Sequence, residues 1–80
     1  MKQIIVVKLG WVLVGDVTPT TRGFTLKNAS VIRKWGTTKG LGELAQRGPL
    51  KDSVLDPIGV ATVQAEATLF RIDCNDTAWP

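Results

Sequence analysis

The sequence predicts a mainly β protein, a small twisted barrel or sandwich of five to six strands with one short helix. Short segments rich in β-branched residues alternate along the chain with turns of glycine, proline and polar residues. Only residues 42–47 have the spacing of a helix. With 80 residues and no linker or repeat, the chain predicts a single domain over residues 1–80.

The first two strands are expected at residues 3–8 and 10–17, where β-branched side chains dominate. A turn near Gly10 separates them, so they predict an antiparallel pair. A loop follows at residues 18–23, because proline and hydroxylated residues cluster there and the alternation of apolar and polar side chains stops.

Residues 24–26 and 29–35 again have a strand pattern, but the alternation slips by one residue near Asn28. Such a slip indicates either a bulge in one bent strand or a tight turn between two strands. We favour the bent strand, since strong bending of a long strand is how a small barrel closes. An SH3-like or Sm-like barrel is therefore the expected architecture.

The expected helix at residues 42–47 has Gly40 or Thr38 as candidate N-terminal caps. Gly48 and Pro49 predict its end, because proline cannot continue a helix and glycine favours the conformation that closes one.

A loop is expected at residues 50–59, followed by two more strands at residues 60–64 and 67–73. The polar tail, residues 75–80, contains Trp79, which indicates that the tail packs against the domain.

The composition points to a small core and to self-association. Hydrophobic residues make up 44% of the chain, and three tryptophans and two phenylalanines are expected to carry much of the core. A domain of this size buries only about 60–65% of its unfolded surface. Because no disulfide framework or metal cluster is available as a staple, we expect a homo-oligomer.

The residue types also exclude most catalytic arrangements. The chain has no histidine, so it lacks the usual general base and the commonest metal ligand. Its single cysteine, Cys74, cannot form an intramolecular disulfide and is expected to be a small apolar residue at a strand end. We therefore expect no enzyme activity, no metal site and no cofactor.

The charge favours an anionic partner. Ten Lys and Arg against seven Asp and Glu give a net charge of +3, which suits a polyanionic or phosphorylated molecule. Four cations fall within a short span in the middle of the chain, at Lys27, Arg33, Lys34 and Lys39.

Residues 35–42, with the sequence WGTTKGLG, form the candidate ligand-binding segment. They match neither the P-loop nor the dinucleotide-binding pattern. Their hydroxyl groups, charge, glycine backbone and indole are nevertheless the groups that bind phosphate and stack on a base. The candidate ligand-binding residues are Arg33, Trp35, Thr37, Thr38, Lys39, Gly40 and Gly42.

A purely structural interpretation of this segment remains open. It places Trp35 in the core, lets the two threonines cap the helix and leaves Lys39 in solvent. By the period of two, Arg33 shares a face with Trp35. It is expected either to pair with Asp73 or Glu43 or to recognise phosphate. Trp11 is expected in the core or at a subunit interface.

The segment VIRKWGTTKGLGELA, followed by Gly48-Pro49, Leu55-Asp56-Pro57 and Ile72-Asp73-Cys74, resembles a family of small phage and bacterial proteins. The resemblance covers most of the chain but implies no particular activity. It implies a context, since small phage proteins of this kind are often inhibitors of a host system, and some are oligomers that trap nucleotide signals.

Three functions follow as hypotheses. The first is an oligomer that binds and sequesters a phosphate-containing small molecule, such as a nucleotide signal, at pockets between subunits, and so inhibits a host defence. The second is a small barrel that binds nucleic acid through Lys27, Lys34 and Lys39. The third is a protein inhibitor of a host factor with exposed tryptophans as anchors.

We expect no membrane partner, because the first apolar run, residues 4–7, ends at Lys8 and is too short for a signal peptide or a membrane helix. A cytoplasmic location is expected, in the host cell if a phage encodes the protein.

Overall fold

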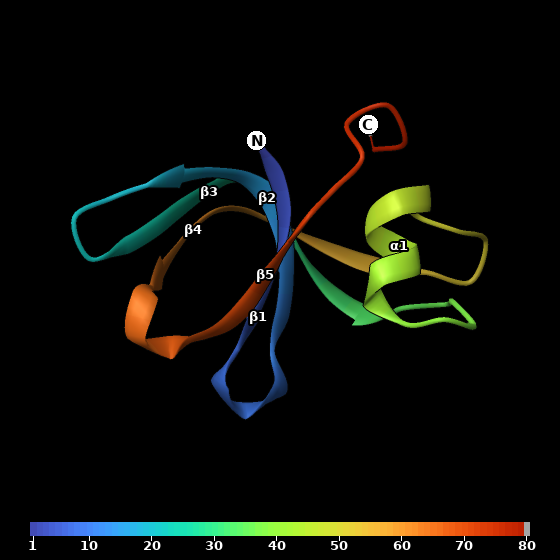
Figure 1. Cartoon of the computed structure of the whole chain (residues 1–80), viewed down its shortest axis with the longest axis horizontal. Helices are drawn as coiled ribbons and strands as arrows, with labels where there is room; N and C mark the ends of the chain where they lie inside the picture. The colour runs from blue at the N-terminus through green and yellow to red at the C-terminus, as the bar shows by residue number, and fades with distance from the viewer. Residues whose placement is uncertain (80) are drawn as a thin grey trace.

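The computed structural model describes residues 1–79 and contains one antiparallel sheet of five strands in the order β4-β3-β2-β1-β5 (Figure 1). The strands are β1 (Lys2–Val7), β2 (Val12–Pro19), β3 (Gly23–Lys34), β4 (Val54–Gln64) and β5 (Thr68–Asp73). The helix α1 (Leu41–Arg47) connects β3 to β4. Two 3-10 turns, η1 (Lys8–Gly10) and η2 (Ala65–Ala67), follow β1 and β4. The predicted class, a small barrel or sandwich with one short helix, is confirmed.

Buried apolar side chains lie on both faces of the sheet. The adjacent residues Ile4 and Ile5 in β1 are both fully buried because they point to opposite faces. The helix-side cluster consists of Ile4, Val12, Val14, Ile32, Leu41, Leu44, Ala45, Cys74 and Trp79. The barrel cluster, on the other face, consists of Ile5, Leu13, Val17, Leu26, Ala29 and Val63.

Strand β3 is continuous and bulges at Asn28, as predicted. Asn28 has a positive φ of 51°, and the pairing of β3 with β4 shifts between Leu26 and Ala29. Phe24 and Leu26 before the bulge pack on the same barrel cluster as Ala29 and Val31 after it. The extra residue therefore keeps the apolar side chains on one face while the strand bends.

Strand β4 begins at Val54, so the prediction of a loop throughout residues 50–59 is wrong. Asp56, Pro57 and Gly59 have the composition of a turn, but β4 is an edge strand and pairs only with β3. Proline is tolerated at an edge because its missing N–H would have no partner strand to face.

The helix α1 and the C-terminal tail pack together, as Trp79 predicted. The Trp79 Nε1–H and the Asn75 N–H both donate to the Ala45 carbonyl oxygen, at 3.0 and 2.9 Å. Gly48 ends the helix with a φ of 78°, and a Cβ there would collide with the backbone of Ala78. The predicted stop is therefore also a point of close backbone contact.

The expectation that aromatic side chains carry the core is wrong. Of the tryptophans only Trp79 is buried, whereas Trp11, Trp35 and Phe70 are 57%, 42% and 52% exposed. Isoleucine, valine, leucine and alanine make up most of the buried core instead. Cys74 is buried as predicted, and this burial raises the pKa of its thiol to about 11.

Candidate ligand-binding loop

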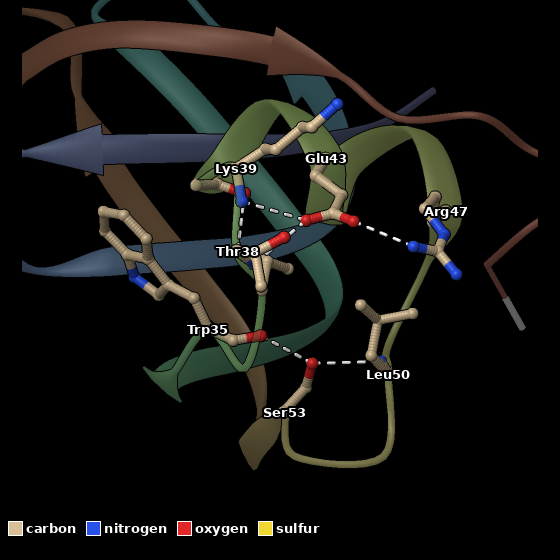
Figure 2. Close-up of polar contacts among 9 residues, drawn as sticks. Trp35, Thr38, Lys39, Glu43, Arg47, Leu50 and Ser53 are labelled. Carbon is tan, nitrogen blue, oxygen red and sulfur yellow. Dashed lines mark hydrogen bonds and ion pairs between the residues drawn. The ribbon is translucent and has the colours of Figure 1, made fainter.

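The candidate segment leaves the end of β3, forms a loop and enters α1 (Figure 2). Its first residue is held by Ser53, whose hydroxyl donates to the Trp35 carbonyl oxygen at 2.6 Å and accepts from the Leu50 N–H at 2.9 Å. Gly36 has a φ of 70°, and a Cβ there would collide with the backbone of Asp52 and Ser53. The loop is therefore fixed against the turn before β4.

Glu43 fixes the other end of the loop. One of its carboxylate oxygens accepts from the N–H groups of Thr38 and Lys39, at 3.1 and 3.0 Å, and the other accepts from Arg47 at 2.8 Å. The hydrogen bond from the Lys39 N–H and the neighbouring Arg47 guanidinium hold the pKa of Glu43 below its ordinary value. Two backbone N–H groups of the candidate segment therefore already hold an internal anion.

The two threonines do not cap α1. The Thr37 hydroxyl donates to the Gly40 carbonyl oxygen at 2.8 Å, and Gly40 itself is the N-terminal cap, without a side-chain hydrogen bond. Glu43, the third residue of the helix, supplies the capping contact by reaching back to the loop. The sequence signal for this contact was a glutamate three residues after the cap.

Arg33 pairs with neither Asp73 nor Glu43, so both predicted partners are wrong. Its Nε lies 2.9 Å from Oδ2 of Asp56, and both side chains are about half exposed or more, at 67% and 48%. Asp56 faces Val31 across the β3–β4 pair and is thus a diagonal neighbour of Arg33. This partner was missed because Asp56 was placed in a loop.

The indole of Trp35 is a partly open surface beside the loop. Its Cζ3 lies 3.9 Å from the position of a Cβ on Gly40, so indole and glycine backbone are close neighbours. Lys34, Thr38 and Lys39 are exposed, and Figure 2 shows the Lys39 side chain extending from the loop away from the indole. The loop thus presents the indole and the Lys39 side chain to solvent in different directions.

Gly42 has no close neighbour on its Cβ side and is exposed on α1. Of the seven candidate residues, Gly40 has a structural role in its positive φ and Thr37 in its hydrogen bond to Gly40, whereas Trp35, Thr38 and Lys39 present side chains to solvent.

A second surface feature was not predicted. A hollow of about 430 Å³ opens beside the β1–β2 connection and is lined by Val7, Trp11, Leu13, Thr62, Val63, Gln64 and Ala67. Trp11 is more than half exposed at its wall, so it does not lie in the core, and its predicted alternative, a subunit interface, stays a prediction. The signal available in the sequence was an indole directly after a glycine turn.

Within residues 1–79, no three His, Cys, Asp or Glu side chains are grouped closely enough to hold a metal ion. The same part of the chain contains no helix with the length and apolar character needed to cross a membrane. No protein-family model matches the sequence, and no curated protein is significantly similar to it. The resemblance to small phage and bacterial proteins stays a prediction.

Proposed function

We propose that this chain is a non-enzymatic binding protein that holds a phosphate-containing small molecule, such as a nucleotide, against Trp35. The observation that carries the proposal is the partly exposed indole, 42% accessible, on a loop fixed from two sides by Ser53 and Glu43. An exposed aromatic ring on a rigid backbone stacks a planar base at little entropic cost.

Side chains, rather than the backbone N–H groups of Thr38 and Lys39, would contact the phosphate. Glu43 already occupies the N–H groups of Thr38 and Lys39. The Lys39 ammonium and the Thr38 hydroxyl are the exposed groups of the same loop, and a lysine on four flexible bonds can turn toward a ligand on the indole. Arg33 can exchange its surface pair with Asp56 for a phosphate, because exposed ion pairs are worth little.

Binding without turnover would sequester the ligand. The chain has no histidine to act as a general base, so the bound molecule is expected to remain intact. In the phage context that the resemblance implies, removal of a nucleotide signal would inhibit a host defence.

The test is calorimetry and native mass spectrometry with three probes, ADP, cyclic AMP and cyclic di-GMP. We expect at least one probe to bind. Lys39→Ala and Trp35→Leu should each weaken binding about tenfold, the usual worth of a charge-assisted hydrogen bond or one stacked base. Lys27→Ala is the matched control, because it removes one exposed cation from the bulge of β3.

Two results would overturn the proposal. One is the failure of all three probes to bind at millimolar concentration. The other is an equal effect of Lys27→Ala and Lys39→Ala, which would indicate a diffuse attraction to anions rather than a site at the loop.

Nucleic-acid binding is the second candidate. The observation in its favour is that Lys34, Lys39 and the Trp35 indole are all exposed. Proteins that bind single-stranded nucleic acids combine cations with exposed aromatic rings in this way. In that case Lys27→Ala would weaken binding as well, because each phosphate contact contributes separately.

A further inference from the structure

The connection between β1 and β2 displays an unusual leucine. Leu9, in η1, is 97% exposed and has a positive φ of 69°. A left-handed backbone conformation is unfavourable for leucine. Because the side chain is exposed, its burial within the chain does not offset this cost. The Val7 N–H closes the connection by donating to the Trp11 carbonyl oxygen at 2.9 Å. The fold therefore holds Leu9 outward on a closed loop.

A shallow, mostly apolar hollow, here called the socket, is lined by residues that flank this leucine in the sequence. The hollow of about 430 Å³ described above is lined by Val7 and Trp11, which flank Leu9 in the sequence, and by residues of β4 and η2 such as Val63 and Ala67. In Figure 1 the β1–β2 connection lies at the bottom of the view and η2 at its lower left. Leu9 is not among the lining residues, so it does not fill the hollow of its own chain.

We propose that a second copy of this chain docks here, with Leu9 of each copy inserted into the hollow of the other. A knob and a socket that adjoin on one surface form a self-complementary patch. A two-fold axis through such a patch places each knob opposite the partner's socket and closes the assembly as a dimer. Exposed apolar groups gathered at one place are typical of such interfaces.

The charges at the two parts of the patch are complementary. Lys8 lies beside the knob and Glu66 lies in η2, between socket residues Gln64 and Ala67. Neither forms an ion pair with any residue of the described part of the chain. In the two-fold arrangement Lys8 of one copy approaches Glu66 of the other, which favours docking in this orientation.

The test measures the mass of the purified full chain by light scattering and sedimentation equilibrium between 1 and 200 µM, as an order-of-magnitude range for weak dimers. We expect a dimer of twice the 8.7 kDa chain mass. Leu9→Asn should weaken dimerisation at least tenfold while the melting temperature of the monomer stays equal or rises, since asparagine tolerates a positive φ better than leucine.

Leu69→Asn is the matched control, because Leu69 is also exposed, at 60%, but lies on β5 and outside the hollow. It should leave dimerisation unchanged. Lys8→Glu should weaken dimerisation, and adding Glu66→Lys should restore it.

Three outcomes would overturn the proposal. The first is a wild-type monomer at 200 µM, the upper limit above, including a monomer whose hollow binds a hydrophobic dye. The second is an unchanged dimer in Leu9→Asn. The third is a loss of dimerisation in Leu69→Asn as large as in Leu9→Asn, which would assign the contact to the edge strand β5.

Discussion

Glu43 is the residue around which the candidate loop is organised. Its carboxylate accepts from two backbone N–H groups of the candidate segment, those of Thr38 and Lys39, and it pairs with Arg47 one helical turn later. Its side chain is only 12% exposed, so its charge is held in a defined place. A side chain of the same chain can thus bind backbone N–H groups of a loop that is rich in glycine and hydroxyl groups. The side chains that remain exposed are the ones to test.

Glu43→Gln should lower the stability of the fold at neutral pH. The fold lowers the pKa of Glu43 below its ordinary value of 4.5 and so favours the charged form. This contribution is complete above the ordinary pKa and is lost as the pH falls through the lower pKa of the folded state. Thermal unfolding of wild type and variant should therefore differ at pH 7 and converge in acid. A difference that persists unchanged to low pH would contradict the role of the charge.

The glycines of the loop differ in their structural roles, and alanine distinguishes them. Gly36→Ala should destabilise the fold by about 1–3 kcal/mol, because the positive φ and the backbone of Asp52 and Ser53 both oppose a Cβ. Gly42→Ala should stabilise it by up to about 1 kcal/mol, since the site is open and helical. Urea unfolding measures both, and destabilisation by Gly42→Ala would reveal a contact that the structure does not contain.

Among the elements, α1 and the C-terminal tail depend on each other. The helix has only seven residues, too few to be stable alone. Trp79 packs on it within the helix-side cluster and donates to the Ala45 carbonyl oxygen. The tail therefore keeps α1 on the sheet, and α1 in turn keeps Glu43 under the candidate loop.

Trp79→Ala should destabilise the fold by about 3–5 kcal/mol, the usual loss for a buried tryptophan. Because small domains have total stabilities of about 5–15 kcal/mol, this variant is expected to be partly unfolded at 37 °C. Trp79→Phe should lose roughly 1–2 kcal/mol, mainly the hydrogen bond, since Asn75 still donates to Ala45. Denaturant unfolding followed by circular dichroism tests both, and a stable Trp79→Ala variant would show that the tail is dispensable.

The elements that the sequence predicted best have local signals. The bulge at Asn28, the end of α1 at Gly48 and the packing of Trp79 each follow from one residue type with one physical property. The start of β4 and the partner of Arg33 were missed together, because Pro57 is acceptable only at a sheet edge. The topology of the whole sheet decides which strand lies at an edge. The residues of a short segment therefore do not predict whether it is an edge strand.

The whole molecule has two separate surfaces for two proposed contacts. The Trp35 loop lies between β3 and α1, whereas Leu9 and its hollow lie between the β1–β2 connection and η2. Since these surfaces share no residue, ligand binding and dimerisation should respond to different substitutions. The hollow beside Trp11 could not be predicted from sequence, because it joins segments about 50 residues apart.

Salt distinguishes the two candidate functions at the scale of the whole charge distribution. A single-stranded polynucleotide whose phosphates contact three lysines would release counterions on binding. The logarithm of its affinity would then fall against the logarithm of the salt concentration with a slope of about −0.7 per contact. Raising salt fivefold would then weaken its binding by about 30-fold.

A ligand with one or two phosphates on the Trp35 loop should lose no more than about threefold, because stacking is insensitive to ionic screening. We expect cyclic di-GMP or another of the three probes to remain bound at high salt, and a labelled oligothymidylate to dissociate. Calorimetry and fluorescence anisotropy at two salt concentrations measure this. Tight oligothymidylate binding with the steep slope, and no probe bound, would instead identify a nucleic-acid-binding protein.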